Sequence, residues 1–123
     1  MKMLTKESSL VIIEGEPGSG KSVVATAAAL FTAAAGGPVL WIDPLGGMFD
    51  YYDSTKQHAN ITTIRPKSQE FSADEFIEAA KGKSLVVIDH ALRDTRRELV
   101  AEASKLSELA GVHVLLTITD DGE

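Results

Sequence analysis

The stretch Gly15-Glu16-Pro17-Gly18-Ser19-Gly20-Lys21-Ser22 decides the fold of this chain, because it has the spacing G-x-x-x-x-G-K-[ST] between two apolar segments. Residues 10–13, before it, predict a buried strand. Residues 21–35, after it, are apolar nearly all round and predict a helix packed on a sheet, ended by Gly36 and Gly37 at positions that tolerate positive φ. A strand, a glycine loop and a helix are therefore expected in that order.

The glycine loop suits an anion, because backbone N–H groups turn inward around it only where Cβ atoms are absent. The helix start adds its positive dipole end. Lys21 is expected to reach the β and γ phosphates of a nucleoside triphosphate, and the Ser22 hydroxyl to ligate Mg²⁺. The predicted nucleotide-binding residues are Gly15, Glu16, Pro17, Gly18, Ser19, Gly20, Lys21, Ser22 and Val23. The competing interpretation, a glycine-rich turn with a chance lysine, is disfavoured by the flanking strand and helix.

The rest of the chain alternates strands with helices, the pattern of a parallel sheet covered on both faces. Further strands are predicted at residues 39–42, 61–64, 85–88 and 112–118, and residues 44–60 predict a loop with room for one short helix. Two helices are expected to begin with capping boxes, one at Ser72 and Glu75 and the other at Thr95 and Glu98, and to end near Gly82 and Gly111. The fold class is α/β, a three-layer sandwich with a mainly parallel five-stranded sheet.

Composition indicates one globular domain over residues 1–123, since 44% of the residues are hydrophobic and 24% charged. A net charge of −6 argues against binding nucleic acid over the whole surface, although it leaves a local basic patch open. The absence of cysteine excludes disulfides. No signal sequence or membrane span is recognised, so we expect a cytoplasmic protein without a membrane partner.

Asp89 ends the apolar run of residues 84–89, and the carboxyl end of a parallel strand opens into the same crevice as the glycine loop. We expect Asp89 to hold Mg²⁺ through water, together with Ser22. Away from such a loop, this aspartate would be a turn or cap residue. His90 is either a group that orients water or a hydrogen-bonded loop residue. His58 is expected in a loop and His113 packed within a strand.

Five segments in order resemble the RecA-like P-loop ATPases, over residues 10–118: GEPGSGKS, VLWID with Asp43 at its end, ITTIRP, LVVID and GVHVLLTIT. The resemblance implies a RecA-like P-loop NTPase core in which the strand ending in Asp89 and the last strand lie between the loop strand and the VLWID strand. It also implies ATP and Mg²⁺ as cofactors and hydrolysis of the β–γ bond. The implied catalytic residues are Lys21, Asp43 and Asp89.

The chain departs from that family at Leu45, where a catalytic glutamate is usual, so nucleotide binding is better supported than hydrolysis. Asp43, Glu16 or His90 remain candidates to activate water; Asp43 ranks first, although it also suits a loop anchor. The family's γ-phosphate sensor position falls near Thr117 and Thr119.

The chain also lacks the family's later strands, which would leave residues 10–13 at a sheet edge. We therefore expect self-association into a homo-oligomer or a lid formed by residues 1–6. Two groups of side chains could each either contact a partner molecule or have an ordinary structural role. The basic group, an arginine finger or a solvated face, is Arg65, Lys67, Arg93, Arg96 and Arg97; the apolar group, a stacking surface or core closure, is Met48, Phe49, Tyr51 and Tyr52. Trp41 is expected in the core.

The expected function is that of a small Mg-ATP-binding protein with slow ATPase activity. By resemblance it would act as an oligomer in DNA replication or recombination, with DNA or a DNA-processing protein as partner. The alternative is a nucleotide-binding regulatory or assembly module without turnover, which Leu45 favours.

Overall fold

The computed structural model of the chain describes residues 2–7, 9–15, 20–42, 60–64, 71–89 and 96–119. Some of the residues singled out from the sequence lie outside these ranges. They are Glu16, Pro17, Gly18, Ser19, Asp43, Leu45, Met48, Phe49, Tyr51, Tyr52, His58, Arg65, Lys67, His90, Arg93 and Thr95, and the side chains of Ser22, Arg96 and Thr119.

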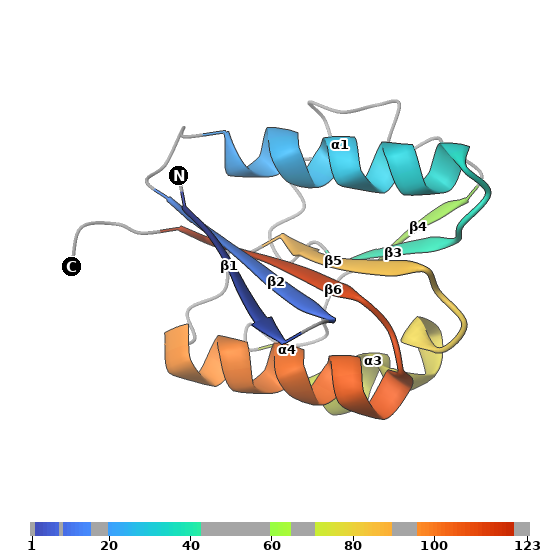
Figure 1. The fold of residues 1–123 in the computed structure, drawn as a ribbon. Helices are drawn as coiled ribbons and strands as arrows, with labels where there is room; N and C mark the ends of the chain where they lie inside the picture. Colours follow the sequence, from blue (N-terminus) through green and yellow to red (C-terminus); the bar gives the residue numbers. More distant parts are fainter. Residues whose placement is uncertain are drawn as a thin grey trace.

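From residue 10 onward, strands and helices follow one another along the chain as the hydrophobic pattern predicts, and one further strand precedes them (Figure 1). In order they are β1 (Lys2–Glu7), β2 (Leu10–Gly15), α1 (Lys21–Ala34), β3 (Val39–Ile42), β4 (Ile61–Ile64), α3 (Ala73–Ala80), β5 (Leu85–Asp89), α4 (Arg96–Ala110) and β6 (Val114–Thr119). The sheet has the strand order β1-β2-β6-β5-β3-β4. The five strands from β2 to β6 are parallel, and β5 and β6 lie between β2 and β3, so the predicted α/β class and strand order are confirmed.

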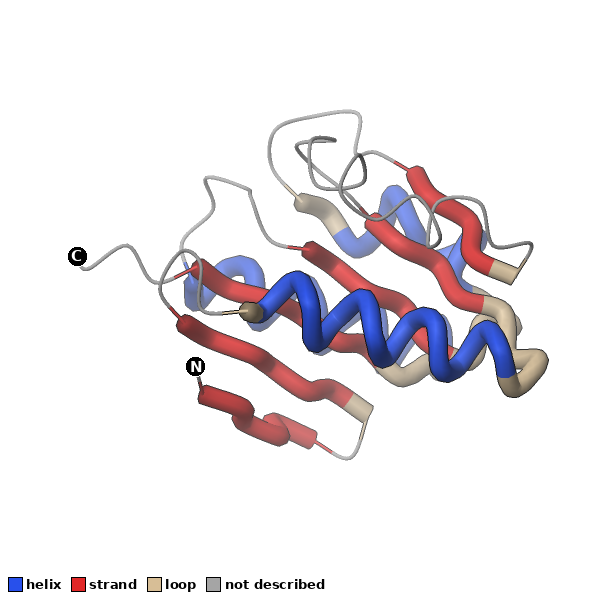
Figure 2. Tube along the Cα trace, turned by 90° about the horizontal axis from the view of Figure 1, so that it is seen from above, coloured by secondary structure: helices blue, strands red, loops and turns tan. Residues whose placement is uncertain are grey.

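Helices cover both faces of the sheet. Figure 1 shows α1 on one side and α3 with α4 on the other, and Figure 2, seen from the α1 side, shows α1 lying over the sheet and running along the direction of the strands. The predicted three-layer sandwich is therefore present. Among the helices that the structure describes, none has the length and apolar character needed to cross a membrane.

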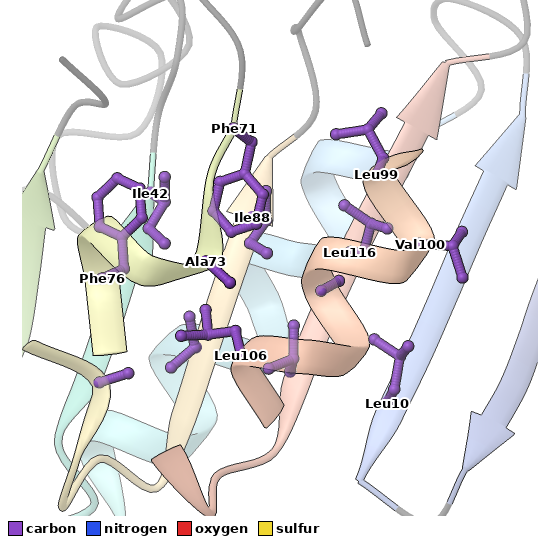
Figure 3. Close-up of a cluster of buried hydrophobic side chains, with 14 of the residues drawn as sticks. Leu10, Ile42, Phe71, Ala73, Phe76, Ile88, Leu99, Val100, Leu106 and Leu116 are labelled. Atoms are coloured by element: carbon purple, nitrogen blue, oxygen red, sulfur yellow. The ribbon is translucent and has the colours of Figure 1, made fainter. Parts of the chain in front are cut away.

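The two faces of each inner strand bury different halves of the core, because successive side chains point to opposite sides. Leu10 and Ile12 of β2 pack with the side chains of α3 and α4, whereas Ile13 packs with the alanines of α1. Figure 3 shows the first of these clusters, with Leu99 and Leu106 of α4 directed toward the sheet. Trp41 is buried in the second cluster, as predicted.

β1 is a strand that the sequence pattern did not identify as one. It pairs antiparallel with β2, from Lys2 opposite Glu14 to Glu7 opposite Leu10, so it occupies the edge that residues 10–13 would otherwise expose. This is the predicted lid of residues 1–6 in the form of a strand. The outer edge of the sheet on this side is now β1 rather than β2. An exposed β2 edge therefore no longer supplies a reason for self-association.

Glycines end α1 for two different reasons. Gly36 has φ of 93°, the left-handed conformation predicted for it. Gly37 does not have positive φ, and this part of the prediction was wrong. A Cβ atom on Gly37 would lie 2.7 Å from Ser84 Oγ, so the residue is needed for close approach of the α1–β3 turn to the start of β5.

Two further predictions from local pattern were also wrong. His113 is exposed rather than packed, because β6 begins only at Val114 and His113 belongs to the preceding turn, where its carbonyl accepts a hydrogen bond from Val86 N–H. Ser72 is the N-cap residue of α3 but makes no side-chain cap hydrogen bond. Instead, the Ala73 N–H donates to Glu102 Oε1 of α4 at 2.8 Å.

Glu102 thus caps α3 from a neighbouring helix, an arrangement that local spacing does not reveal. We predict that Glu102→Ala lowers the free energy of unfolding by about 1 kcal/mol, because it removes the acceptor at a helix start. Glu102→Gln keeps an acceptor oxygen and should retain most of that stability. Urea unfolding of the three proteins measures the difference, and equal midpoints for Glu102→Ala and the parent chain would contradict the assignment.

Candidate functional site

The carboxyl ends of β2, β5 and β6 meet the start of α1 at one edge of the sheet. β2 ends at Gly15, which pairs with Thr119 of β6, and β5 ends at Asp89, which pairs with Thr117. α1 begins at Lys21 after the connection from β2. Parallel strands bring their carboxyl ends to a common edge, which is where α/β proteins bind ligands.

Lys21 is the first residue of α1 and is buried, with 7% of its surface exposed. A lysine is rarely this deeply buried at a helix start, since its ammonium group loses water on burial. Gly20, the N-cap residue, adopts φ of 95° and ψ of 12°, a left-handed conformation that sets the direction in which the helix leaves the loop. Of the predicted loop, Gly15 ends β2, and Gly20 and Lys21 lie at the start of α1.

Asp89 and Thr117 form a buried pair on the α1 side of the sheet. Asp89 is 4% exposed and Thr117 is 1% exposed. The Thr117 hydroxyl donates a hydrogen bond of 2.9 Å to Asp89 Oδ1. Side-chain alternation explains the shared face: Val87 and Leu115, two positions earlier on the same strands, both pack in the cluster beneath α1. Lys21, Asp89 and Thr117 thus belong to one face and one edge.

This donor set fits Mg²⁺ bound together with a polyphosphate better than a metal held by protein alone. Within the ranges that the structure describes, no three His, Cys, Asp or Glu side chains gather into a group that would hold a metal ion. Mg²⁺ keeps several waters and is usually bound by one or two carboxylates with substrate phosphates. The buried Asp89 carboxylate fits that requirement, because it supplies a hard oxygen atom at the end of β5.

For three other residues singled out from the sequence, the structure gives the helix in which each lies, and for two of them the exposure. Val23 is 57% exposed on α1. Ser22 lies in the first turn of α1, one residue after Lys21. Arg97 is exposed on α4, which covers the face opposite α1, as the solvated-face interpretation expects.

The bond between Thr117 and Asp89 was missed from the sequence, which singled out Thr117 only as a sensor position. The available signal was a polar residue inside the apolar strand sequence VLLTIT. Its partner could not be read from spacing, because the two residues are 28 positions apart and meet only through the β5–β6 register.

The sheet order, the two helical layers and this edge define a RecA-like α/β fold. Comparison with solved structures agrees: the chain is similar to flagellar accessory protein FlaH from Methanocaldococcus jannaschii, with a TM-score of 0.61 and 18% sequence identity. The match covers 90% of this chain and 61% of FlaH, so the chain spans less than two thirds of that protein. No protein-family model and no curated protein sequence matches the chain. The RecA-like resemblance inferred from motifs is thus confirmed as a fold.

The left-handed conformation of Gly20 generates a test with an internal control at the other end of the same helix. Gly20 and Gly36 have φ of 95° and 93°, and a Cβ atom on either would meet nothing within 4 Å. We predict that Gly20→Ala and Gly36→Ala each lower the free energy of unfolding by about 1–2 kcal/mol, because the cost is conformational rather than steric. Thermal unfolding measures both, and no loss in either variant would contradict the two backbone conformations.

Proposed function

We propose that this chain binds Mg-ATP at the edge formed by β2, β5, β6 and the start of α1, and that it hydrolyses ATP slowly. The observation that carries the proposal is the burial of Lys21 and Asp89 on one face and one edge of the sheet. A buried ammonium group at a helix start and a buried carboxylate at the end of a parallel strand are the groups that a phosphate chain and its metal ion, respectively, would contact.

In this proposal residues 15–22 surround the phosphates with backbone N–H groups, and the start of α1 adds its dipole. Lys21 neutralises charge on the β and γ phosphates. Ser22 and Asp89 would hold Mg²⁺, which would neutralise negative charge on the phosphates. The RecA-like fold, shared with FlaH, supports nucleotide binding by analogy only.

Turnover is proposed to be slow because Leu45 occupies the position where the RecA-like family usually has its catalytic glutamate. Asp43, at the end of the VLWID segment, is the first candidate to orient water in its place.

A second candidate function is a nucleotide-binding assembly module without turnover. Leu45 favours it, and so does the similarity to a protein described as a flagellar accessory protein. The expected role in DNA replication or recombination finds no support in these comparisons. We infer protein partners, or further copies of this chain, rather than DNA.

The binding proposal is tested with Lys21→Ala. This substitution removes the ammonium group that would contact the phosphates. It should weaken Mg-ATP binding by about 10- to 100-fold, the range for loss of a hydrogen bond to a charged group. Lys81→Ala is the matched control, since Lys81 is an exposed lysine whose visible partner is Glu78 of the neighbouring turn. Isothermal titration with Mg-ATP measures the affinities, and an unchanged affinity for Lys21→Ala would overturn the proposal.

The glycine pair gives an independent check on the site. Since Gly20 precedes Lys21 and Gly36 lies at the far end of α1, only Gly20→Ala should weaken Mg-ATP binding, although both variants lose stability. Equal weakening by the two substitutions would indicate a general effect on folding.

The two candidate functions separate in a steady-state phosphate-release assay. We expect slow release that Lys21→Ala abolishes and that Asp43→Asn lowers at least tenfold with Mg-ATP affinity retained, because the carboxylate would act on water and not on the phosphates. If the parent chain releases phosphate no faster than Lys21→Ala does, the module without turnover is favoured instead. Adding single-stranded DNA to the same assay tests the DNA partner, and we expect no stimulation.

A further inference from the structure

We infer that Thr117 is a positioning residue that orients the Asp89 carboxylate for Mg²⁺, and that it is not a γ-phosphate sensor. The inference rests on the proposed Mg-ATP binding and adds to it a role for one residue of β6.

The geometry that carries the inference is the pairing of two buried residues on adjacent strands. Asp89 and Thr117 are direct partners in the β5–β6 register, and the hydroxyl-to-carboxylate distance is 2.9 Å. With 1% of Thr117 and 4% of Asp89 exposed, bulk water competes little for this bond. The backbone pairing of β5 with β6 fixes the positions of both residues and so stabilises this hydrogen bond.

A carboxylate rotates about its Cβ–Cγ bond, so a fixed donor at Oδ1 also fixes the position of Oδ2. Thr117 is suited to this role because a β-branched side chain has restricted χ1 rotation. The pair of strand positions before it on the same face, Val87 and Leu115, is apolar and offers no side-chain donor. Compared with these two apolar positions, Thr117 supplies the hydroxyl that can align Asp89.

The same bond argues against a sensor role. A threonine hydroxyl has one proton, and Thr117 donates it to Asp89. A sensor would need that proton for a γ-phosphate oxygen. The two roles make different predictions: loss of a sensor weakens ATP binding but not ADP binding, whereas loss of a positioning residue weakens the contribution of Mg²⁺ to both. Residues that orient metal ligands typically change metal affinity by about 10- to 100-fold when replaced.

The test uses Thr117→Val, which keeps the shape and removes the hydroxyl, and Thr117→Ser, which keeps the hydroxyl. Isothermal titration gives the affinities for ATP and ADP, each with Mg²⁺ and with EDTA, for both variants and the parent chain. We expect Thr117→Val to reduce, by about tenfold, the factor by which Mg²⁺ increases the affinity for ATP and for ADP. The affinities measured in EDTA should equal those of the parent chain. Thr117→Ser should restore the gain to within about threefold of the parent.

Thr117→Ala repeats the test if Thr117→Val does not fold, and thermal unfolding identifies that case. In an Asp89→Asn background the valine substitution should have no further effect on the Mg²⁺-dependent gain, because the two residues act through one interaction.

A parent chain that binds neither nucleotide overturns the proposed function and this inference together. If Mg²⁺ increases the nucleotide affinity of the parent chain and of Thr117→Val by the same factor, only the inference is overturned. A loss confined to ATP assigns Thr117 to sensing and also overturns it. An equal loss with Mg²⁺ and with EDTA overturns it as well, since the effect would then not pass through the metal.

Discussion

The pairing of β2, β6 and β5 as neighbouring parallel strands is the constraint on which the rest of this structure depends. Parallel pairing puts the carboxyl ends of all three strands at one edge, although Gly15 and Asp89 are far apart along the chain. The connection from β2 then returns over the sheet as α1, and its first residue, Lys21, starts at the same edge. A basic group and an acidic group are thereby gathered by parallel strand pairing together with the packing of α1 on the sheet.

Charged side chains are buried at this end of the sheet. A buried lysine and a buried aspartate each lose hydration. Buried charged groups at the carboxyl end of a parallel sheet are candidates for a functional site. The Thr117 hydroxyl donates a hydrogen bond to Asp89, and the described side chains around Thr117 in β6 are apolar: Val114, Leu115, Leu116 and Ile118.

The amino-terminal strand changes one edge of the sheet. β1 pairs antiparallel with β2 and covers an edge that would otherwise present unpaired backbone N–H and C=O groups. The helices on the opposite face are joined by a bond from the Ala73 N–H to Glu102 and by the ion pair of Lys105 with Asp74 at 3.1 Å. The hydrogen bond and charge of Asp74 raise the pKa of Lys105, so this lysine keeps its proton further into the alkaline range than an isolated lysine would.

By itself, the sequence determined the class of fold, the order of strands and helices, and the candidate loop of residues 15–22, because hydrophobic periodicity and glycine spacing are local properties. Strand order followed from a family resemblance rather than from spacing, and the structure agrees with it. Only the tertiary structure decided the pairing of Thr117 with Asp89, the capping of α3 by Glu102 and the identity of residues 2–7 as an edge strand. Each of these joins groups from different elements, and the distance between such groups is set by register and packing, which no local pattern encodes.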